Sequence, residues 1–149
     1  MTKNELIEFV KPYLKKQGFL KKNNKWTKVQ GEFTVILAIQ GSLYDKNTYY
    51  IRPEILINAV HSEDCLSHFS IDIKQVNTLQ VINDFEDFCR DWTNKDFIRK
   101  TLVKFMEWEE RNPLEKRRAG LCDYVNDPVP SNVCFSIPIE AKNYIIENF

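Results

Sequence analysis

Glycine is scarce in this chain, with four among 149 residues. Loops that cradle nucleotide phosphates are built from closely spaced glycines, so such a loop is hard to form here. The motifs GxSxG and HExxH and a paired Cys-His motif are also absent. The familiar catalytic machineries are therefore not indicated, no cofactor is implied, and an enzyme is the less favoured class.

The chain also lacks an excess of charge and a long hydrophobic run. Its 21 basic and 21 acidic residues balance, so no global field would draw it to nucleic acid or to an anionic membrane. No apolar run could span a bilayer, and the first residues lead into an amphipathic pattern rather than the apolar core of a signal peptide. We expect a cytoplasmic protein with no membrane partner, and nucleic acid is not favoured.

No CxxC motif is present. The four cysteines are Cys65, Cys89, Cys122 and Cys134, and they lie far apart in the sequence. In a reducing compartment such cysteines are buried thiols rather than disulfides.

What the sequence does contain is strands followed by helices, which predicts an α+β fold. Residues 33–40 and 49–57 are rich in β-branched and aromatic residues, and the polar residues 45–48 between them indicate a hairpin. With residues 25–30 and 68–73 they predict a four-stranded antiparallel meander. Residues 19–24 read as a link to the first strand. Pro53 predicts a bulge or an edge position in the third strand.

Helical patterns flank this strand region. Thr2 and Glu5 have the spacing of a capping box, Gly18 ends the first helix, and Pro12 predicts a kink or break within it. Further helices are expected from Thr78, from Asn94 or Asp96 to Pro113, over residues 114–119, and from Pro138 to Ile145. We expect the N-terminal and C-terminal helices to pack on one face of the sheet within a single domain, residues 1–149, and to bury Phe85 and Phe105.

Short motifs in the N-terminal half occur in a familiar order. After the opening helix come Gly-Phe-Leu-Lys-Lys at residues 18–22, Trp26, Ile-Gln-Gly-Ser at residues 39–42, Tyr44 and Tyr-Tyr-Ile at residues 49–51. This order resembles the bacterial family catalogued as domain of unknown function 4304, although Arg52 and Pro53 depart from its usual continuation. The resemblance implies an α+β cytoplasmic domain. It supplies no catalytic residues, because the family has no settled activity.

Three candidate sites compete with plainer interpretations. His61, Cys65 and His68 would share a face if their segment were helical and could then bind zinc, but the neighbouring alternation favours strands. Eight lysines among the first 28 residues, with Trp26 beside them, could bind phosphate, but a solvated helix face is the favoured interpretation. The carboxylates at positions 107, 109 and 110 border a charged run and are interpreted as surface charge.

The remaining candidate is a polar and aromatic set around the hairpin. Its members are Gln40, Tyr44, Tyr49, Tyr50 and Arg52. Tyrosine and arginine are favoured at interfaces, while ordinary cross-strand pairing explains the same set equally well. We expect Tyr50 and Arg52 to face opposite to Tyr49.

The sequence thus favours a non-catalytic protein-binding module with a protein partner. By analogy alone, small bacterial α+β proteins of this kind include immunity proteins against toxins. The alternative is a small metal-dependent hydrolase that uses the His61, Cys65 and His68 cluster. Oligomeric state is not readable from the sequence.

Overall fold

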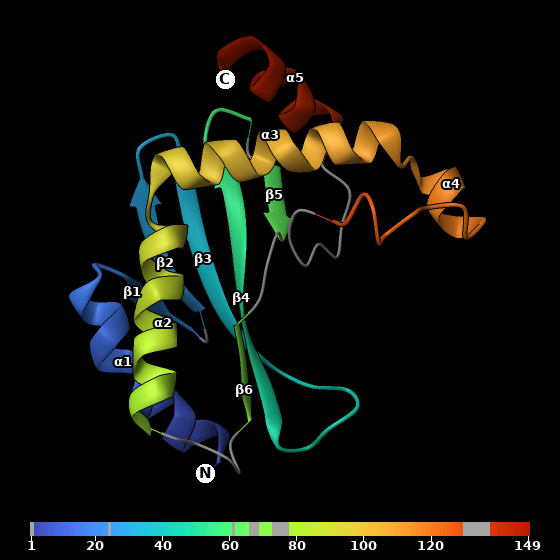
Figure 1. The fold of residues 1–149 in the computed structure, drawn as a ribbon. Helices are drawn as coiled ribbons and strands as arrows, with labels where there is room; N and C mark the ends of the chain where they lie inside the picture. Colours follow the sequence, from blue (N-terminus) through green and yellow to red (C-terminus); the bar gives the residue numbers. More distant parts are fainter. Residues whose placement is uncertain (1, 24, 61, 66–68, 73–77, 130–137) are drawn as a thin grey trace.

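A computed structural model of the chain describes residues 2–23, 25–60, 62–65, 69–72, 78–129 and 138–149 (Figure 1). Its elements in chain order are α1 (Lys3–Lys16), β1 (Leu20–Lys22), β2 (Lys25–Gln30), β3 (Phe33–Gly41), β4 (Thr48–Ile57), β5 (Ser62–Cys65), β6 (Phe69–Asp72), α2 (Thr78–Trp92), α3 (Lys95–Arg111), α4 (Leu114–Arg118) and α5 (Ile139–Asn148). The strands precede α2 to α5, as the sequence predicts for an α+β fold.

Helix α1 begins with the predicted capping box. The Thr2 hydroxyl accepts the Glu5 backbone N–H at 3.2 Å, and the Thr2 backbone N–H donates to the Glu5 carboxylate at 2.5 Å. These bonds satisfy backbone donors that the first turn leaves without helical partners. The helix then continues through Pro12 to Lys16, so the predicted break does not occur. Its buried face consists of Leu6, Val10 and Leu14.

Strands β1 to β4 form an antiparallel meander, which confirms the predicted fold class. The outer side of β4 pairs with two short strands: β5 along residues 54–57 and β6 along residues 48–51. Strands β1 and β5 enlarge the predicted four-stranded sheet to six strands. The interpretation of residues 19–24 as a link was wrong, because Lys21 pairs with Trp26 across β1 and β2. All three side chains of β1 are exposed, so β1 carries no burial alternation that would reveal it.

Pro53 lies within β4 without a bulge. The pairing of β3 with β4 runs without interruption from Phe33 opposite Ile57 to Gly41 opposite Tyr49. On the outer side, β5 and β6 are offset by one residue in register, and the described pairs omit Arg52 and Pro53. The residues between β5 and β6 lie outside the described part of the chain, so the predicted edge position of Pro53 stays a prediction.

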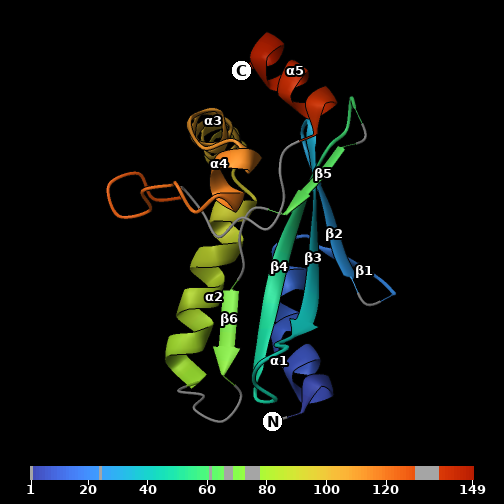
Figure 2. The same cartoon turned by 90° about the vertical axis from the view of Figure 1, so that its right-hand side faces the viewer.

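Burial alternates along both long strands, and one face of the sheet forms the core. Phe33, Val35 and Leu37 on β3 are buried, as are Ile51, Ile55 and Ile57 on β4, while the residues between them on β3 are only partly buried. Figure 2 shows α2 and α3 on one side of the sheet. Tyr13 of α1 meets Phe85 of α2 edge-on at 6.4 Å between ring centroids, which joins α1 to the same layer.

Helix α3 begins and ends where the sequence predicts. The Asn94 side chain accepts the backbone N–H groups of Asp96 and Phe97 at 2.9 and 3.2 Å, which identifies Asn94 as the cap. Asn112 ends α3, and the short helix α4 follows Pro113. Phe85 and Phe105 are both buried, at 0% and 1% exposure, as predicted.

Truncation of either phenylalanine should destabilise the protein strongly. Phe85→Ala or Phe105→Ala leaves a cavity in a closely packed core, and we expect a loss of about 3–5 kcal/mol in the free energy of unfolding by chemical denaturation. Val125→Ala is the matched control, because Val125 is 88% exposed and its truncation should change stability by less than about 0.5 kcal/mol. A loss below about 1 kcal/mol for both phenylalanine variants would contradict the assigned core.

Candidate functional site

Three of the predicted interface residues share the sheet face that points away from the core. Gln40 lies opposite Tyr50 on the neighbouring strand, and Arg52 lies opposite Ala38. The Arg52 guanidinium donates to the Gln40 side-chain oxygen at 2.7 Å. Gln40, Tyr50 and Arg52 therefore form a polar row across β3 and β4 that leads toward the hairpin loop.

Tyr49 does not belong to this row. It lies on the same face as Ile51, which is fully buried, and its ring is partly buried against the hydrophobic core. A Cβ atom added at Gly41, opposite Tyr49, would lie 3.7 Å from the Tyr49 ring. Tyr49 thus packs against the core side of the hairpin and does not contribute to the outer face.

Tyr44 lies in the hairpin loop beside Leu43, and these are the most exposed large hydrophobic residues described, at 96% and 89%. The loop is closed by a network of hydrogen bonds. The Ser42 hydroxyl accepts the backbone N–H groups of Tyr44 and Asp45 at 3.1 and 3.2 Å. The Asp45 carboxylate accepts the Asn47 backbone N–H at 2.9 Å and the Thr48 hydroxyl at 2.7 Å. The polar side chains fix the turn, and the two apolar side chains point into solvent.

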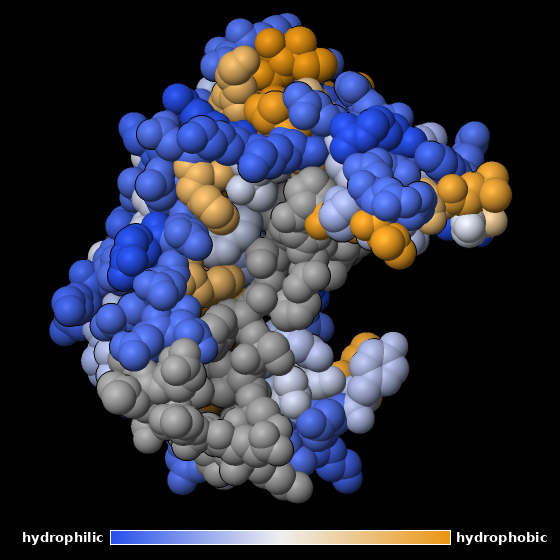
Figure 3. All heavy atoms as spheres, in the orientation of Figure 1, coloured by the Kyte–Doolittle hydropathy of each residue, from blue (hydrophilic) through white to orange (hydrophobic). Residues whose placement is uncertain are grey.

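A second loop, residues 120–127 after α4, also carries exposed apolar residues. Leu121 is 70% exposed, Tyr124 51% and Val125 88%. In Figures 1 and 3 this loop and the β3–β4 hairpin project from the same side of the molecule.

The second loop is held to α3 through Asp127. Arg111 donates to both Asp127 carboxylate oxygens at 3.2 and 2.9 Å, and the Trp108 indole N–H donates to the Asp127 backbone carbonyl at 3.0 Å. The hydrogen bonds from Arg111, and after them the one from Asn112, favour the charged carboxylate and so lower the pKa of Asp127. Tyr124 stacks on Trp108 with 6.2 Å between ring centroids.

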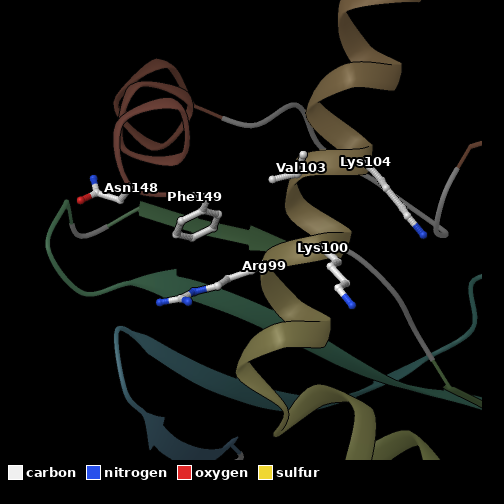
Figure 4. A pocket seen from close by; sticks show the side chains of 6 residues that line it. All are labelled: Arg99, Lys100, Val103, Lys104, Asn148 and Phe149. Carbon is white, nitrogen blue, oxygen red and sulfur yellow. The ribbon is translucent and has the colours of Figure 1, made fainter.

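A cavity of about 390 Å³ lies between α3 and the end of α5 (Figure 4). Its lining residues are Arg99, Lys100, Val103, Lys104, Asn148 and Phe149. In Figure 4, Arg99 lies beneath the Phe149 ring, whereas Lys100 and Lys104 extend away from it. No lining side chain is a nucleophile with an adjacent base, so the cavity offers an apolar surface bordered by cations.

Arg99 also belongs to a polar cluster beneath this cavity. It forms an ion pair with Glu32 in the turn between β2 and β3, and Glu32 accepts the Tyr144 hydroxyl at 3.1 Å. Burial, reinforced by the hydrogen bond to Glu32, raises the pKa of Tyr144. The Glu32 carboxylate thus links both α3 and α5 to the sheet. We interpret this cluster as a contact that stabilises the fold.

The interpretation of the carboxylates at positions 107, 109 and 110 as surface charge was wrong for Glu109. Its side chain is only 6% exposed, and the Lys142 ammonium lies 2.5 Å from one carboxylate oxygen. The Arg117 guanidinium lies 3.8 Å from the other. These residues border a cavity of about 280 Å³ between α3, α4 and α5. Glu107 and Glu110 are exposed, as predicted.

The other sequence-predicted sites have different outcomes. Ser62–Cys65 forms β5, whereas the zinc hypothesis needs a helix there, and His61 and His68 lie outside the described residues, so that hypothesis stays a prediction. Within the described part of the chain, no group of three or more His, Cys, Asp and Glu side chains could hold a metal ion. Trp26 is 2% exposed, so it cannot serve as a platform for stacking bases.

The described thiols differ in environment. Cys89 is buried, and desolvation raises the pKa of its thiol to about 12, so it remains neutral at physiological pH. Cys122 is free and partly exposed. Cys65 ends β5, and Cys134 lies outside the described residues.

Comparison with protein families assigns the described strands, helix α2 and parts of α1 and α3 to one family. The model for the domain of unknown function DUF4304 matches residues 10–102, which extend from α1 into α3. The chain belongs to this family. The match extends the predicted N-terminal resemblance through α2, while the Glu109 cluster and the 120–127 loop lie outside the matched residues. No curated protein and no solved structure gives a significant match. Among the described helices, none has the length and apolar character needed to cross a membrane.

The effects of mutating Glu109 and Lys142 on stability should depend on each other, because the two side chains form an ion pair. Lys142→Met removes the nearest cation and leaves the carboxylate dependent on Arg117, so we expect a loss of about 2–3 kcal/mol in unfolding free energy. The double variant Glu109→Gln/Lys142→Met should be more stable than Lys142→Met, because it removes the uncompensated charge. Lys104→Met on the exposed side of α3 is the control for loss of one lysine. Equal losses in the single and double variants would contradict the coupling.

The cysteines should all be reduced but unequally reactive. In the native protein at about pH 8, we expect an alkylating reagent to modify Cys122 and to leave Cys89 unmodified, because the thiolate is the reactive form. After unfolding, all four cysteines should react without prior reduction. Peptide mass spectrometry would assign each site, and a pair that reacts only after reduction would reveal a disulfide.

Proposed function

We propose that this protein is a non-catalytic protein-binding module and that its β3–β4 hairpin is the contact element. The observation that carries the proposal is the adjacent exposed pair Leu43 and Tyr44 on a turn closed by hydrogen bonds. Adjacent large apolar side chains in water gain free energy when a partner covers them. Because hydrogen bonds already order the turn, the turn would lose little conformational entropy when a partner binds it.

The polar row beside the loop supports the same role. Tyr50 and Arg52 are residue types enriched at the energetic centres of interfaces, where they combine large contact area with hydrogen-bonding tips. The hydrogen bond from Arg52 to Gln40 orients the guanidinium on the sheet face before a partner arrives. The proposed contact element therefore combines an apolar tip with a polar, partly ordered flank.

The 120–127 loop supplies a second apolar point on the same side of the molecule. Its exposed Leu121 and Val125 are positioned by the anchoring of Asp127 to α3. A partner that contacts both projections would lie against this side of the molecule (Figure 3). We propose that the hairpin is the primary contact and that this loop lies at its border.

The chemistry of the described cavities supports binding over catalysis. Their charged side chains are lysines, arginines and glutamates, with Glu109 engaged by Lys142 and Arg117, and the buried Cys89 is held as a neutral thiol. A nucleophile needs a lowered pKa or an adjacent base. Inhibition of another protein, as immunity proteins inhibit toxins, remains an analogy that guides the choice of partner to test.

Removal of the apolar tip should abolish partner binding without unfolding the protein. We expect tagged Leu43→Ser/Tyr44→Ser protein to lose, in affinity capture from the native host, a partner that the wild type enriches. The melting temperature should hardly change, because exposed substitutions usually alter stability by less than about 0.5 kcal/mol. Tyr50→Ala/Arg52→Ala should weaken the same capture.

Ile139→Ser/Ile146→Ser is the matched control, because both side chains lie on α5 and are 63% and 64% exposed. It removes a similar exposed apolar pair far from the hairpin and should retain the partner. Undiminished capture by a folded Leu43→Ser/Tyr44→Ser variant would contradict the proposed contact element.

A further inference from the structure

The net neutrality of the chain conceals a strong segregation of charge. The first 31 residues contain eight of the 21 basic residues and two of the 21 acidic residues, and the other 118 contain 13 basic and 19 acidic residues. Residues 9–31 contain seven lysines and no acidic residue. Within the part of the chain that the structure describes, only Lys11 and Lys25 of these seven lie within 4 Å of a carboxylate, that of Glu8 or Glu54. The excess positive charge is therefore local and largely uncompensated.

The fold gathers part of this charge around a cavity of about 200 Å³ between α1 and β1. The cavity is lined by Lys11, Lys15, Phe19, Leu20, Lys21 and Trp26. The lysines border it, and its apolar lining comes from Phe19, Leu20 and Trp26. The Lys21 ammonium lies 5.6 Å from the Trp26 ring centroid, so it is held above that lining. Leu20 is 76% exposed beside the opening.

We propose that this surface, the α1–β1 lysine surface, binds an acidic segment of a protein partner. Acidic side chains would meet Lys11, Lys15 and Lys21, and one large apolar side chain of the segment would enter the cavity beside Leu20. The occupant follows from charge complementarity combined with an apolar recess, since either feature alone would select a less specific ligand. The surface lies at the β1 side of the sheet, whereas the hairpin projects from the other side (Figure 1).

The same residues argue against a nucleic acid as the occupant. Trp26 is 2% exposed and covered by Lys21, so it has no free ring face for a base. The first 51 residues contain no arginine, the residue that recognises phosphates and guanine with two parallel hydrogen bonds. Lysines on the edge strand β1 also discourage addition of a partner strand. The acidic segment would therefore bind over the side chains rather than extend the sheet.

Fluorescence anisotropy with defined probes tests the proposal on the full chain. The probes are labelled peptides of repeated Glu-Glu-Phe and repeated Glu-Glu-Ala, and an oligothymidylate of similar length. We expect the Glu-Glu-Phe peptide to bind most tightly and to weaken as salt rises to about physiological strength. Lys15→Glu/Lys21→Glu should weaken that binding about tenfold or more. The milder Lys15→Gln/Lys21→Gln should weaken it less, and it replaces the reversal variant if that variant does not fold.

Two control variants distinguish binding at the α1–β1 lysine surface from general effects of charge and of surface substitution. Lys100→Glu/Lys104→Glu on α3 makes the same change of charge outside the surface and should leave binding within about twofold. Leu20→Ser should reduce affinity for the Glu-Glu-Phe peptide about fivefold to tenfold and leave the Glu-Glu-Ala peptide unaffected. Val29→Ser, a change at a 68% exposed position on β2, should affect neither peptide.

Four outcomes would overturn the proposal. Oligothymidylate binding as tight as the Glu-Glu-Phe peptide would assign the surface to nucleic acid. Equal weakening by the α1–β1 and α3 charge reversals, or no effect of Leu20→Ser, would remove the site. Salt-sensitive self-association in sedimentation velocity that Lys15→Glu/Lys21→Glu abolishes would assign the surface to a second copy of the chain.

Discussion

The rest of the structure depends on the uninterrupted pairing of β3 with β4. Because its register runs without a bulge from Phe33 opposite Ile57 to Gly41 opposite Tyr49, buried residues on the two strands remain on one face over the whole hairpin. A slip of one residue would send every one of those side chains to the opposite face. The same register places the Gln40, Tyr50 and Arg52 row on the outer face and carries Leu43 and Tyr44 beyond the end of the sheet. One pairing therefore creates both the core and the proposed contact element.

Features with a local cause could be predicted from the sequence. The capping box of α1, the cap of α3 at Asn94, which was one of two predicted positions, and the β3–β4 hairpin each depend on residues close together in the chain, and each occurs where expected. Strand β1 could not be predicted in the same way, since a three-residue strand with every side chain exposed has no periodic signal. Pro53 predicted a bulge or an edge position, but β3 pairs with β4 past it without a bulge.

The candidate sites show the same difference between features with a local cause and features that depend on distant residues. The hairpin residues were visible as a cluster in sequence, and strand periodicity separated Tyr49 from Tyr50 and Arg52. Glu109 was not visible, because it lies in a charged run and the lysine that neutralises it is 33 positions later, on α5. The lysine-rich N-terminus was visible as composition, but the recess between α1 and β1 and the coverage of Trp26 arise only from packing. Sequence patterns can therefore reveal sites whose residues are close in the chain, whereas sites formed by distant elements can be recognised only in the structure.

The contacts of α5 with the turn between β2 and β3 also constrain how the chain reaches its native state during synthesis. Tyr144 hydrogen-bonds Glu32 across 112 positions, and Phe149 covers Phe33 with an edge-on ring contact. A nascent chain on the ribosome can pair β2, β3 and β4 early, since these strands are joined by short connections. The contact between Phe33 and Phe149, however, can form only after α5 has been translated. Closure of so long a loop adds little free energy per residue but delays the contact, so docking of α5 should be among the last steps of folding.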